Sequence, residues 1–275
     1  MTAGAGAALS AEIAFFLAGI VLAWTKVLSP SARARRQPHL LQPWKIAPAD
    51  FILVVALACI GVVTAGAATS LLARSHPMGR DATLVVGGTA MHVGILAGLL
   101  AYRWAFAPRP LPARPPLAPA LTSGAATFLV ALPLLLAVSN VWESLLEKWG
   151  LPAEKQELVD ILENSGSLPV RIGLIVIAIF IVPITEELLF RAGLYRYLRT
   201  RIPRQAAMIL TAVLFGALHV NWSTFDGLAS SLPLAVLAIV FCMAYERTGN
   251  IGTTIVAHAL YNLNTVLLIA SGATL

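Results

Sequence analysis

Long runs of hydrophobic residues recur along the chain, separated by short segments that carry proline, arginine or other polar residues. A helix that crosses the hydrocarbon of a bilayer needs roughly 20 mostly apolar residues. The pattern predicts an all-α fold, a polytopic membrane bundle of about eight transmembrane helices. The expected spans are 7–28, 50–72, 82–106, 119–142, 169–197, 205–222, 229–245 and 250–270.

Composition also indicates a membrane environment. Of the 275 residues, 58% are hydrophobic and only 12% are charged, whereas a soluble domain has about 25% charged residues. The formal net charge of +6 does not indicate nucleic acid as a partner, because the basic residues follow the predicted membrane. With the amino terminus outside, the inner side of the membrane holds fourteen of the 19 lysines and arginines, as the positive-inside rule predicts. The expected partner around the chain is the lipid bilayer.

The predicted spans differ in chemistry between the two halves of the chain. The interiors of the first four carry almost no ionisable residue apart from His92, whereas the last four carry two glutamates, an arginine and two histidines. His92 has no polar neighbour in the sequence, and we expect it to pack without a functional role. The contrast predicts residues 1–165 as accessory transmembrane helices with surface loops and residues 166–275 as the four-helix core that carries the chemistry.

Three joints between the spans have a distinctive composition. The segment Ser29–Ala49 is basic, and we expect it to contact anionic headgroups, as do the arginines between Arg191 and Arg204. Pro108–Pro119 is rich in proline and is predicted to be extended. Glu143–Ser167 is acidic with apolar residues at helical spacing, which predicts a short helix on the outer surface.

The first polar cluster inside a predicted span contains Glu186, Glu187 and Arg191. An ionisable side chain in the hydrocarbon costs roughly 2.5–3.5 kcal/mol, so such a cluster indicates a functional site. Glu187 and Arg191 are four residues apart, in the order that favours an ion pair on a helix. Glu186 points about 100° away from that pair, which leaves its carboxylate available for chemistry. Pro183 removes a backbone donor just before the cluster and is expected to kink the helix.

Two further clusters lie in later spans. Phe215 and His219 are four residues apart, as are His258 and Asn262, so each pair occupies one face of a helix. Glu186 and His219 flank the same predicted bend at similar distances along the chain, which allows them to lie at one depth in the membrane. The three clusters are therefore expected to converge on one polar site.

The motifs Glu-Glu-x-x-x-Arg, Phe-x-x-x-His and His-x-x-x-Asn, in that order, resemble those of the Abi family. This is the CAAX-protease and bacteriocin-processing (CPBP) family of intramembrane endopeptidases, which includes the type II CAAX prenyl endopeptidases. The resemblance covers Leu168–Ile269, the last four predicted spans. It implies a hydrolase of the protease class that cleaves a peptide bond of a membrane-associated substrate, with residues 166–275 as its catalytic core.

The resemblance also implies roles for single residues. Glu186 activates a water molecule and His219 assists it, while His258 and Asn262 stabilise the tetrahedral oxyanion. Peptide hydrolysis needs these functions on physical grounds as well: a base for the water, donors for the oxyanion and a proton for the leaving amine. The residues expected to support the site are Glu187, Arg191 and Phe215.

Two alternatives remain open from the residues alone. Glu186, His219 and His258 could together hold a divalent metal such as zinc, which would make the enzyme a metalloprotease; no His-Glu-x-x-His motif is present. Chains of Glu and His in membrane helices also form proton relays. A proton-coupled transporter is therefore one rival class, and a non-catalytic membrane scaffold is another.

The expected substrate is a peptide or protein at the membrane. Arginine far outnumbers lysine and alanine is abundant, which favours a GC-rich bacterial genome and hence a bacterial cell membrane. We expect the last four spans to enclose a conical cavity that opens toward the cytoplasmic side or toward the lipid.

Overall fold

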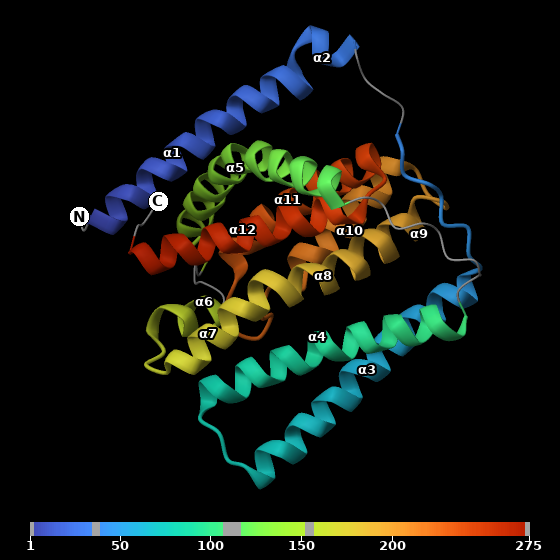
Figure 1. Ribbon diagram of the computed structural model, residues 1–275, viewed down its shortest axis with the longest axis vertical. Coiled ribbons are helices and arrows are strands. Elements are labelled where there is room, and N and C mark those ends of the chain that lie inside the picture. The colour runs from blue at the N-terminus through green and yellow to red at the C-terminus, as the bar shows by residue number, and fades with distance from the viewer. Residues whose placement is uncertain (1–2, 35–38, 107–116, 152–156, 273–275) are drawn as a thin grey trace.

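The computed structural model describes residues 3–34, 39–106, 117–151 and 157–272, and every regular element in these ranges is a helix (Figure 1). The predicted all-α fold is confirmed. Labels with η mark π-helical stretches. In chain order the helices are α1 (Ala3–Ala23), η1 (Trp24–Leu28), α2 (Pro30–Ala34), α3 (Pro48–Ser75), α4 (Arg80–Ala105), α5 (Leu117–Lys148), α6 (Glu157–Asn164), α7 (Leu168–Val176), η2 (Ile177–Ile181), α8 (Val182–Glu186), η3 (Glu187–Tyr195), α9 (Arg196–Leu198), α10 (Arg204–Ala217), α11 (Leu228–Thr248) and α12 (Ile251–Ser271).

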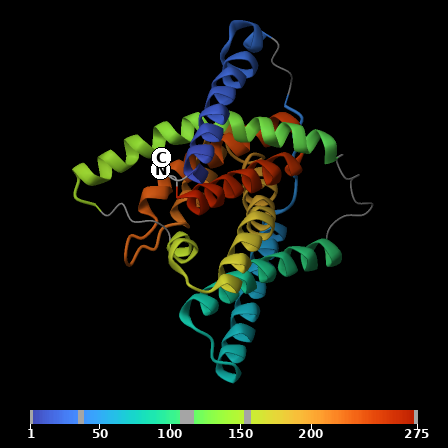
Figure 2. The same ribbon diagram turned by 60° about the vertical axis from the view of Figure 1, so that its left-hand side comes forward.

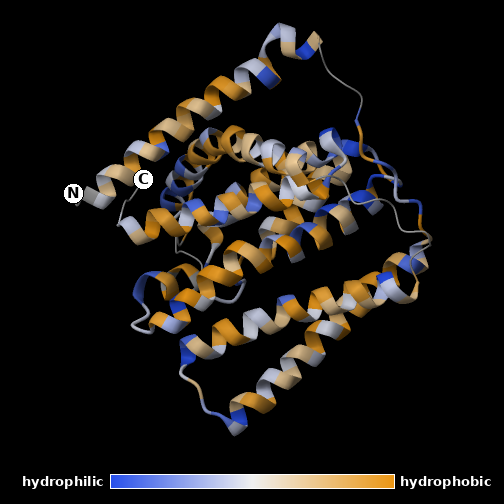
Figure 3. Ribbon diagram, in the orientation of Figure 1, coloured by the Kyte–Doolittle hydropathy of each residue, from blue (hydrophilic) through white to orange (hydrophobic). Residues whose placement is uncertain are grey.

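Within the described residues, 7 helical stretches are long and apolar enough to cross a membrane, and each corresponds to a predicted span. One of them, Leu168–Leu198, runs continuously through α7, η2, α8, η3 and α9. The chain is an integral, multi-pass membrane protein. Its residues agree: hydrophobic positions predominate along the helices (Figure 3), and Ile52, Val63 and Leu100 are 67%, 70% and 62% exposed. Such a surface is suited to hydrocarbon and not to water.

The remaining predicted span, 205–222, is shorter than expected. Its helix α10 has 14 residues and a length of about 21 Å, less than the roughly 30 Å of the hydrocarbon core. The helix ends at Ala217, where the backbone forms tighter turns. His219 N donates to the carbonyl of Gly216, and Val220 N donates to the carbonyl of Ala217, in each case only three residues back. His219 therefore lies just beyond the helix, at the start of the loop 218–227.

Helices α5, α11 and α12 form the centre of the bundle and share a buried apolar cluster (Figures 1 and 2). Glycine residues allow neighbouring helices to approach closely, both within this centre and between α10 and α11. A Cβ at Gly124 of α5 would meet the side chain of Val256 of α12 at 2.6 Å. A Cβ at Gly216 would collide with the backbone carbonyl of Ser231, so α10 packs tightly on α11.

The first helices pack on two different sides of this centre. The α3–α4 hairpin lies at one side of the bundle in Figure 1 and contacts α7, η2 and α8 through α4. In α3, Phe51 stacks on Tyr197 of α9 with ring centroids 3.8 Å apart. Helix α1 packs along α5 and carries Glu12, which is 3% exposed and accepts a hydrogen bond from Asn264 Nδ2 at 3.2 Å. The prediction that the first spans are nearly free of ionisable groups therefore overlooked Glu12.

The acidic joint after residue 143 contains the predicted short helix. Helix α5 continues to Lys148, and α6 follows as an eight-residue helix. Ile161 and Leu162 of α6 are buried against Leu174 and Val266, so α6 is attached to the end of the bundle where α7 begins. Most of the proline-rich segment 108–119 lies outside the described residues.

Glu246 lies at the opposite end of the later helices, surrounded by basic side chains. It is 1% exposed, and its carboxylate accepts hydrogen bonds from Tyr195 Oη at 2.6 Å and Arg199 Nη2 at 2.9 Å. Burial, the largest single cause, lowers the pKa of Arg199, but the hydrogen bond with Glu246, the attraction of its charge and the interactions with Tyr195 together raise this pKa. We call this region the basic end, formed by Glu246 and by Arg196, Arg199, Arg201 and Arg204.

The basic end holds part of the loop that precedes α3. Arg196 Nε donates to the carbonyl of Gln42 at 2.9 Å, and Leu40 N donates to the carbonyl of Glu246 at 2.9 Å. Arg201 donates to the carbonyl of Ile46. These arginines were predicted to contact headgroups; in the structure several of their groups bind residues 39–46 of the protein itself.

Candidate active site

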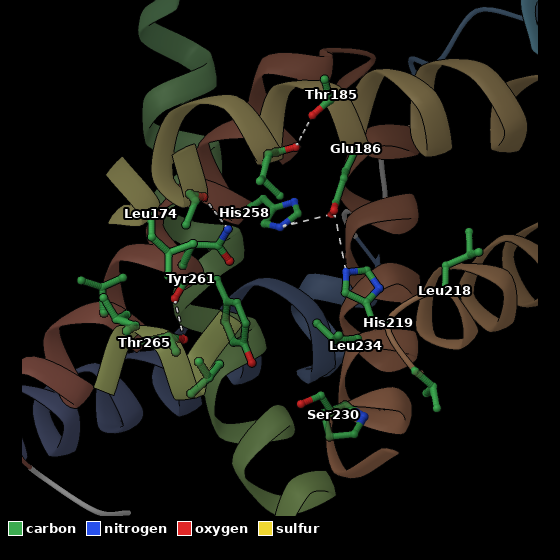
Figure 4. Close-up of a pocket in the computed structure, with 18 of the residues that line it drawn as sticks. Leu174, Thr185, Glu186, Leu218, His219, Ser230, Leu234, His258, Tyr261 and Thr265 are labelled. Atoms are coloured by element: carbon green, nitrogen blue, oxygen red, sulfur yellow. Dashed lines mark hydrogen bonds and ion pairs between the residues drawn. The ribbon is translucent and has the colours of Figure 1, made fainter. Parts of the chain in front are cut away.

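A cavity of about 740 Å³ contains the predicted polar residues on its wall (Figure 4). Glu186, His219, His258 and Asn262 all line it. They come from α8, from the loop after α10 and from α12, so the structure brings the three predicted motifs together.

The sequence predicted that the last four spans enclose the cavity. In the structure, earlier helices also contribute to its wall. Met91 and His92 come from α4, Glu143 from α5 and Leu162 from α6. The predicted boundary near residue 165 therefore divides the sequence, but both parts contribute to the cavity.

Glu187 and Arg191 form the predicted ion pair beneath the cavity. Arg191 Nη1 donates to Glu187 Oε1 at 2.8 Å, and both side chains are 0% exposed. The remaining guanidinium nitrogens of Arg191 have no hydrogen-bond partner among the described residues. Instead the guanidinium lies over the rings of Phe215 and Phe241, 4.4 Å and 5.2 Å from their centroids, where cation–π attraction offsets part of the cost of burial. Phe215 thus supports the charge pair.

His258 lies between the two glutamates. Its Nδ1 is 2.9 Å from Glu187 Oε1, and its Nε2 is 3.8 Å from Glu186 Oε2. Because an ionised carboxylate can only accept, Nδ1 carries the proton. The ring is thereby oriented with Nε2 toward Glu186.

His219 approaches the other oxygen of Glu186. Its Nδ1 lies 2.7 Å from the carbonyl of Phe215, which can only accept, so Nδ1 carries a proton here as well. Nε2 lies 3.8 Å from Glu186 Oε1. The ring of Phe215 packs against the imidazole with a centroid distance of 4.7 Å, as the four-residue spacing of these two residues predicted.

Asn262 is placed on the wall by the irregular helix opposite. Its Nδ2 donates to the carbonyl of Ala178 at 2.7 Å. In the π-helical register of η2, Val182 N donates to Ile177 O; the next donor in that register would be residue 183, and Pro183 has no N–H. Asn262 satisfies this released carbonyl, so one of its two amide protons is already used.

His92 is the residue of the site that sequence reasoning missed. It is 7% exposed, lines the cavity, and its Nδ1 lies 2.8 Å from Thr185 Oγ1, next to Glu186. Thr185 is itself 0% exposed and donates its hydroxyl proton to the carbonyls of Ile181 and Val182. This polar partner could not be predicted because Thr185 is distant in sequence. The position of His92 in the middle of a membrane span was the available signal.

The cavity extends from the buried residues Thr185 and His258 to a mouth where Glu143, Leu218 and Asn221 are exposed. The loop 218–227 and the basic end lie at opposite ends of α10 and α11. The charge asymmetry predicts the basic end to be cytoplasmic, which would place the mouth on the outer side. Of the two predicted openings, toward the cytoplasmic side or toward the lipid, the first is therefore incompatible with the predicted orientation.

The residues that were considered as metal ligands are not arranged as a metal site. Among the described residues, no group of three His, Cys, Asp or Glu side chains is placed to hold a metal ion. Nδ1 of both His219 and His258 is engaged, which leaves the Nε2 of each ring directed toward Glu186.

Comparison with known proteins agrees with the motifs. Residues 168–264 match the family model described as type II CAAX prenyl endopeptidase Rce1-like. No curated protein and no solved structure matches the chain. The matched segment contains every predicted catalytic and supporting residue but not His92. Over residues 168–264 the chain is therefore similar to the type II CAAX prenyl endopeptidases, as its three motifs predicted.

Proposed function

We propose that the protein hydrolyses a peptide bond of a membrane-associated substrate with Glu186 as the general base. The observation that carries this proposal is the position of Glu186, whose two oxygens lie 3.8 Å from His219 Nε2 and 3.8 Å from His258 Nε2 on the cavity wall. The neighbouring Glu187 is already bound to Arg191. Glu186 Oε2, in contrast, is buried and has no hydrogen-bond partner among the described groups.

Glu186 and His219 together suit the binding of the attacking water. Their 3.8 Å separation is too long for a direct hydrogen bond, and one water molecule can bridge it. Both groups present acceptors, so the water donates one proton to each and turns an oxygen lone pair toward the substrate carbonyl. Proton removal by a positioned base typically contributes about 10²–10⁴-fold to the rate.

His258 and Asn262 suit the stabilisation of the oxyanion. Glu187 accepts the Nδ1 proton of His258, which turns Nε2 of this ring toward Glu186. Nε2 in its protonated form and the second amide proton of Asn262 are the proposed donors to the oxygen as its negative charge develops. Glu187 thus acts through His258 and does not touch the substrate.

The proposed hydrolysis is balanced with water as the only co-reactant. Water adds to the carbonyl carbon and its proton passes to Glu186; the C–N bond then breaks and this proton moves to the leaving nitrogen. The products are one new carboxyl group and one free amine, and Glu186 is regenerated as the base.

We propose a bacterial cell membrane as the location of the protein, on the basis of its composition.

A cleavage assay with matched variants tests the proposal. Purified protein in lipid discs is incubated with a library of apolar peptides, with and without chelator, and products are identified by mass spectrometry. We expect Glu186→Gln to abolish cleavage and Glu147→Gln, which changes an exposed glutamate outside the cavity wall, to preserve it. Chelator is expected to have no effect.

Other outcomes of this assay would overturn the proposal. Cleavage that persists in Glu186→Gln would remove the proposed base, and loss of cleavage with chelator would favour a metal at the site. If no peptide is cleaved, proton uptake into vesicles that depends on Glu186 would indicate a transporter. A cellular function that survives Glu186→Gln would indicate a scaffold.

A further inference from the structure

The charges on the cavity wall differ in sign from the charge of the chain as a whole. The described residues that line the cavity include three carboxylates, Glu143, Glu186 and Asp226, and no lysine or arginine. The chain nevertheless has 19 lysines and arginines and a formal net charge of +6. Lys148 and Arg171 are close in sequence to the cavity residues Glu143 and Leu174, but neither lines the cavity.

Two of these carboxylates lie toward the mouth. Glu143 is exposed on α5, and Asp226 is half-buried in the loop 218–227. The loop fixes the backbone of Asp226, whose carbonyl accepts from Asn221 N at 3.0 Å. Within the described part of the chain no ion pair joins Glu143 or Asp226 to a basic side chain. No described basic side chain therefore neutralises these two carboxylates at the mouth.

Between the mouth and Glu186 the wall is largely apolar. Met91, Ile95, Leu162, Leu174 and Leu234 line it, from four different parts of the chain. Hydrophobic side chains of a bound peptide are stabilised there by removal from water. The wall thus combines an apolar interior with a mouth of negative charge.

We infer that the site selects apolar peptides that carry lysine or arginine next to the apolar segment, and that it discriminates against substrates with a carboxylate at that position, a free carboxyl terminus included. This inference rests on the proposed function. A cationic side chain at the mouth gains attraction from Glu143 and Asp226. A substrate carboxylate would meet like charges and, among the described cavity residues, no cation to replace its hydration.

Paired peptides test this selectivity. One peptide has an apolar segment flanked by lysine, a second has glutamate in its place, and both are made with a free or an amidated carboxyl terminus. The protein is compared with a variant that combines Glu143→Gln and Asp226→Asn. Its matched control combines Glu147→Gln and Asp81→Asn, which also removes two carboxylates but neither from the cavity wall.

We expect kcat/KM to favour the lysine peptide over the glutamate peptide by about tenfold, because each exposed charge pair contributes up to about fivefold. The double variant at the mouth should reduce this preference to about twofold, whereas the control should keep it. The preference should also fall as salt is added, since the mouth is exposed to solvent. Amidation of the carboxyl terminus should improve both peptides.

Equal cleavage of the two peptides, or a preference for glutamate, would overturn the inference while leaving the proposed reaction intact. So would an unchanged preference in the mouth variant. If neither peptide is cleaved, the proposed function fails, and binding of the two peptides to the intact protein decides the selectivity by itself. Equal affinities would then contradict the inference.

Discussion

The basic end and the cavity each contain a glutamate within the helical bundle, and their surroundings satisfy the two carboxylates to different degrees. Glu246 is 1% exposed and accepts hydrogen bonds from Tyr195 and from Arg199. The side chain of Glu186 is 16% exposed, and its nearest partners are two imidazoles at 3.8 Å. The saturated carboxylate can only hold helices together, whereas the unsaturated one can bind water and move a proton.

Glu187 lies between these extremes. Its Oε1 accepts from both Arg191 and His258, while its Oε2 has no partner among the described groups. It therefore shares the ion-pair role of Glu246 and also orients a residue of the cavity. Neighbouring glutamates in one motif can thus serve different purposes, and their partners indicate which.

The largest effect on stability is expected from Glu187→Gln. The substitution leaves Arg191 buried without its counter-charge, which typically costs about 3–5 kcal/mol. We expect a large fall in the free energy of unfolding, measured by denaturation in detergent, together with reduced cleavage because His258 loses its acceptor. Unchanged stability would show that the cation–π contacts alone sustain Arg191.

A smaller loss of stability with no loss of chemistry is expected from Glu246→Gln. Hydrogen bonds to a charged group typically contribute about 1.5–3 kcal/mol, and the amide keeps only part of them. The variant should unfold more easily but cleave at the normal rate per folded molecule. A specific loss of cleavage at full stability would contradict the separation of the two regions.

A still smaller effect is expected at His92, which ties α4 to the cavity. His92→Ala removes the contact with Thr185 and should lower kcat by about tenfold, equivalent to one buried hydrogen bond. His92→Asn is the matched rescue, because its amide nitrogen replaces Nδ1. Rescue of kcat with an unaltered pH profile would identify His92 as a positioning residue. Failure of the asparagine variant with a shifted profile would instead indicate that the ring exchanges a proton.

The sequence predicted the helices and the convergence of three motifs because these depend on local patterns. Apolar runs of membrane length and residues four apart on one face are visible without a structure, and Glu187 with Arg191 is a case in which the pair follows from spacing alone. The partner of His92 could not be predicted in this way, since Thr185 is 93 residues distant. Nor could the attachment of residues 39–46 to the arginines of the basic end.

The length of α10 and the residues that line the cavity also could not be predicted from the sequence, because both depend on the tertiary structure. An apolar run continues past Ala217, but the backbone turns there to place His219 against Glu186. Likewise Glu143 and Asp226 line the cavity from a surface helix end and a loop. Their sequence neighbourhoods contain no motif that connects them with the site.

The most direct test of the central claim measures single-turnover cleavage and melting temperature together for the wild-type protein, Glu186→Gln and Glu246→Gln. Our account predicts that Glu186→Gln loses about 10²–10⁴-fold in rate at an unchanged melting temperature, and that Glu246→Gln shows the reverse, a lower melting temperature at an unchanged rate. A Glu186→Gln protein that is fully folded and cleaves at the wild-type rate would contradict it.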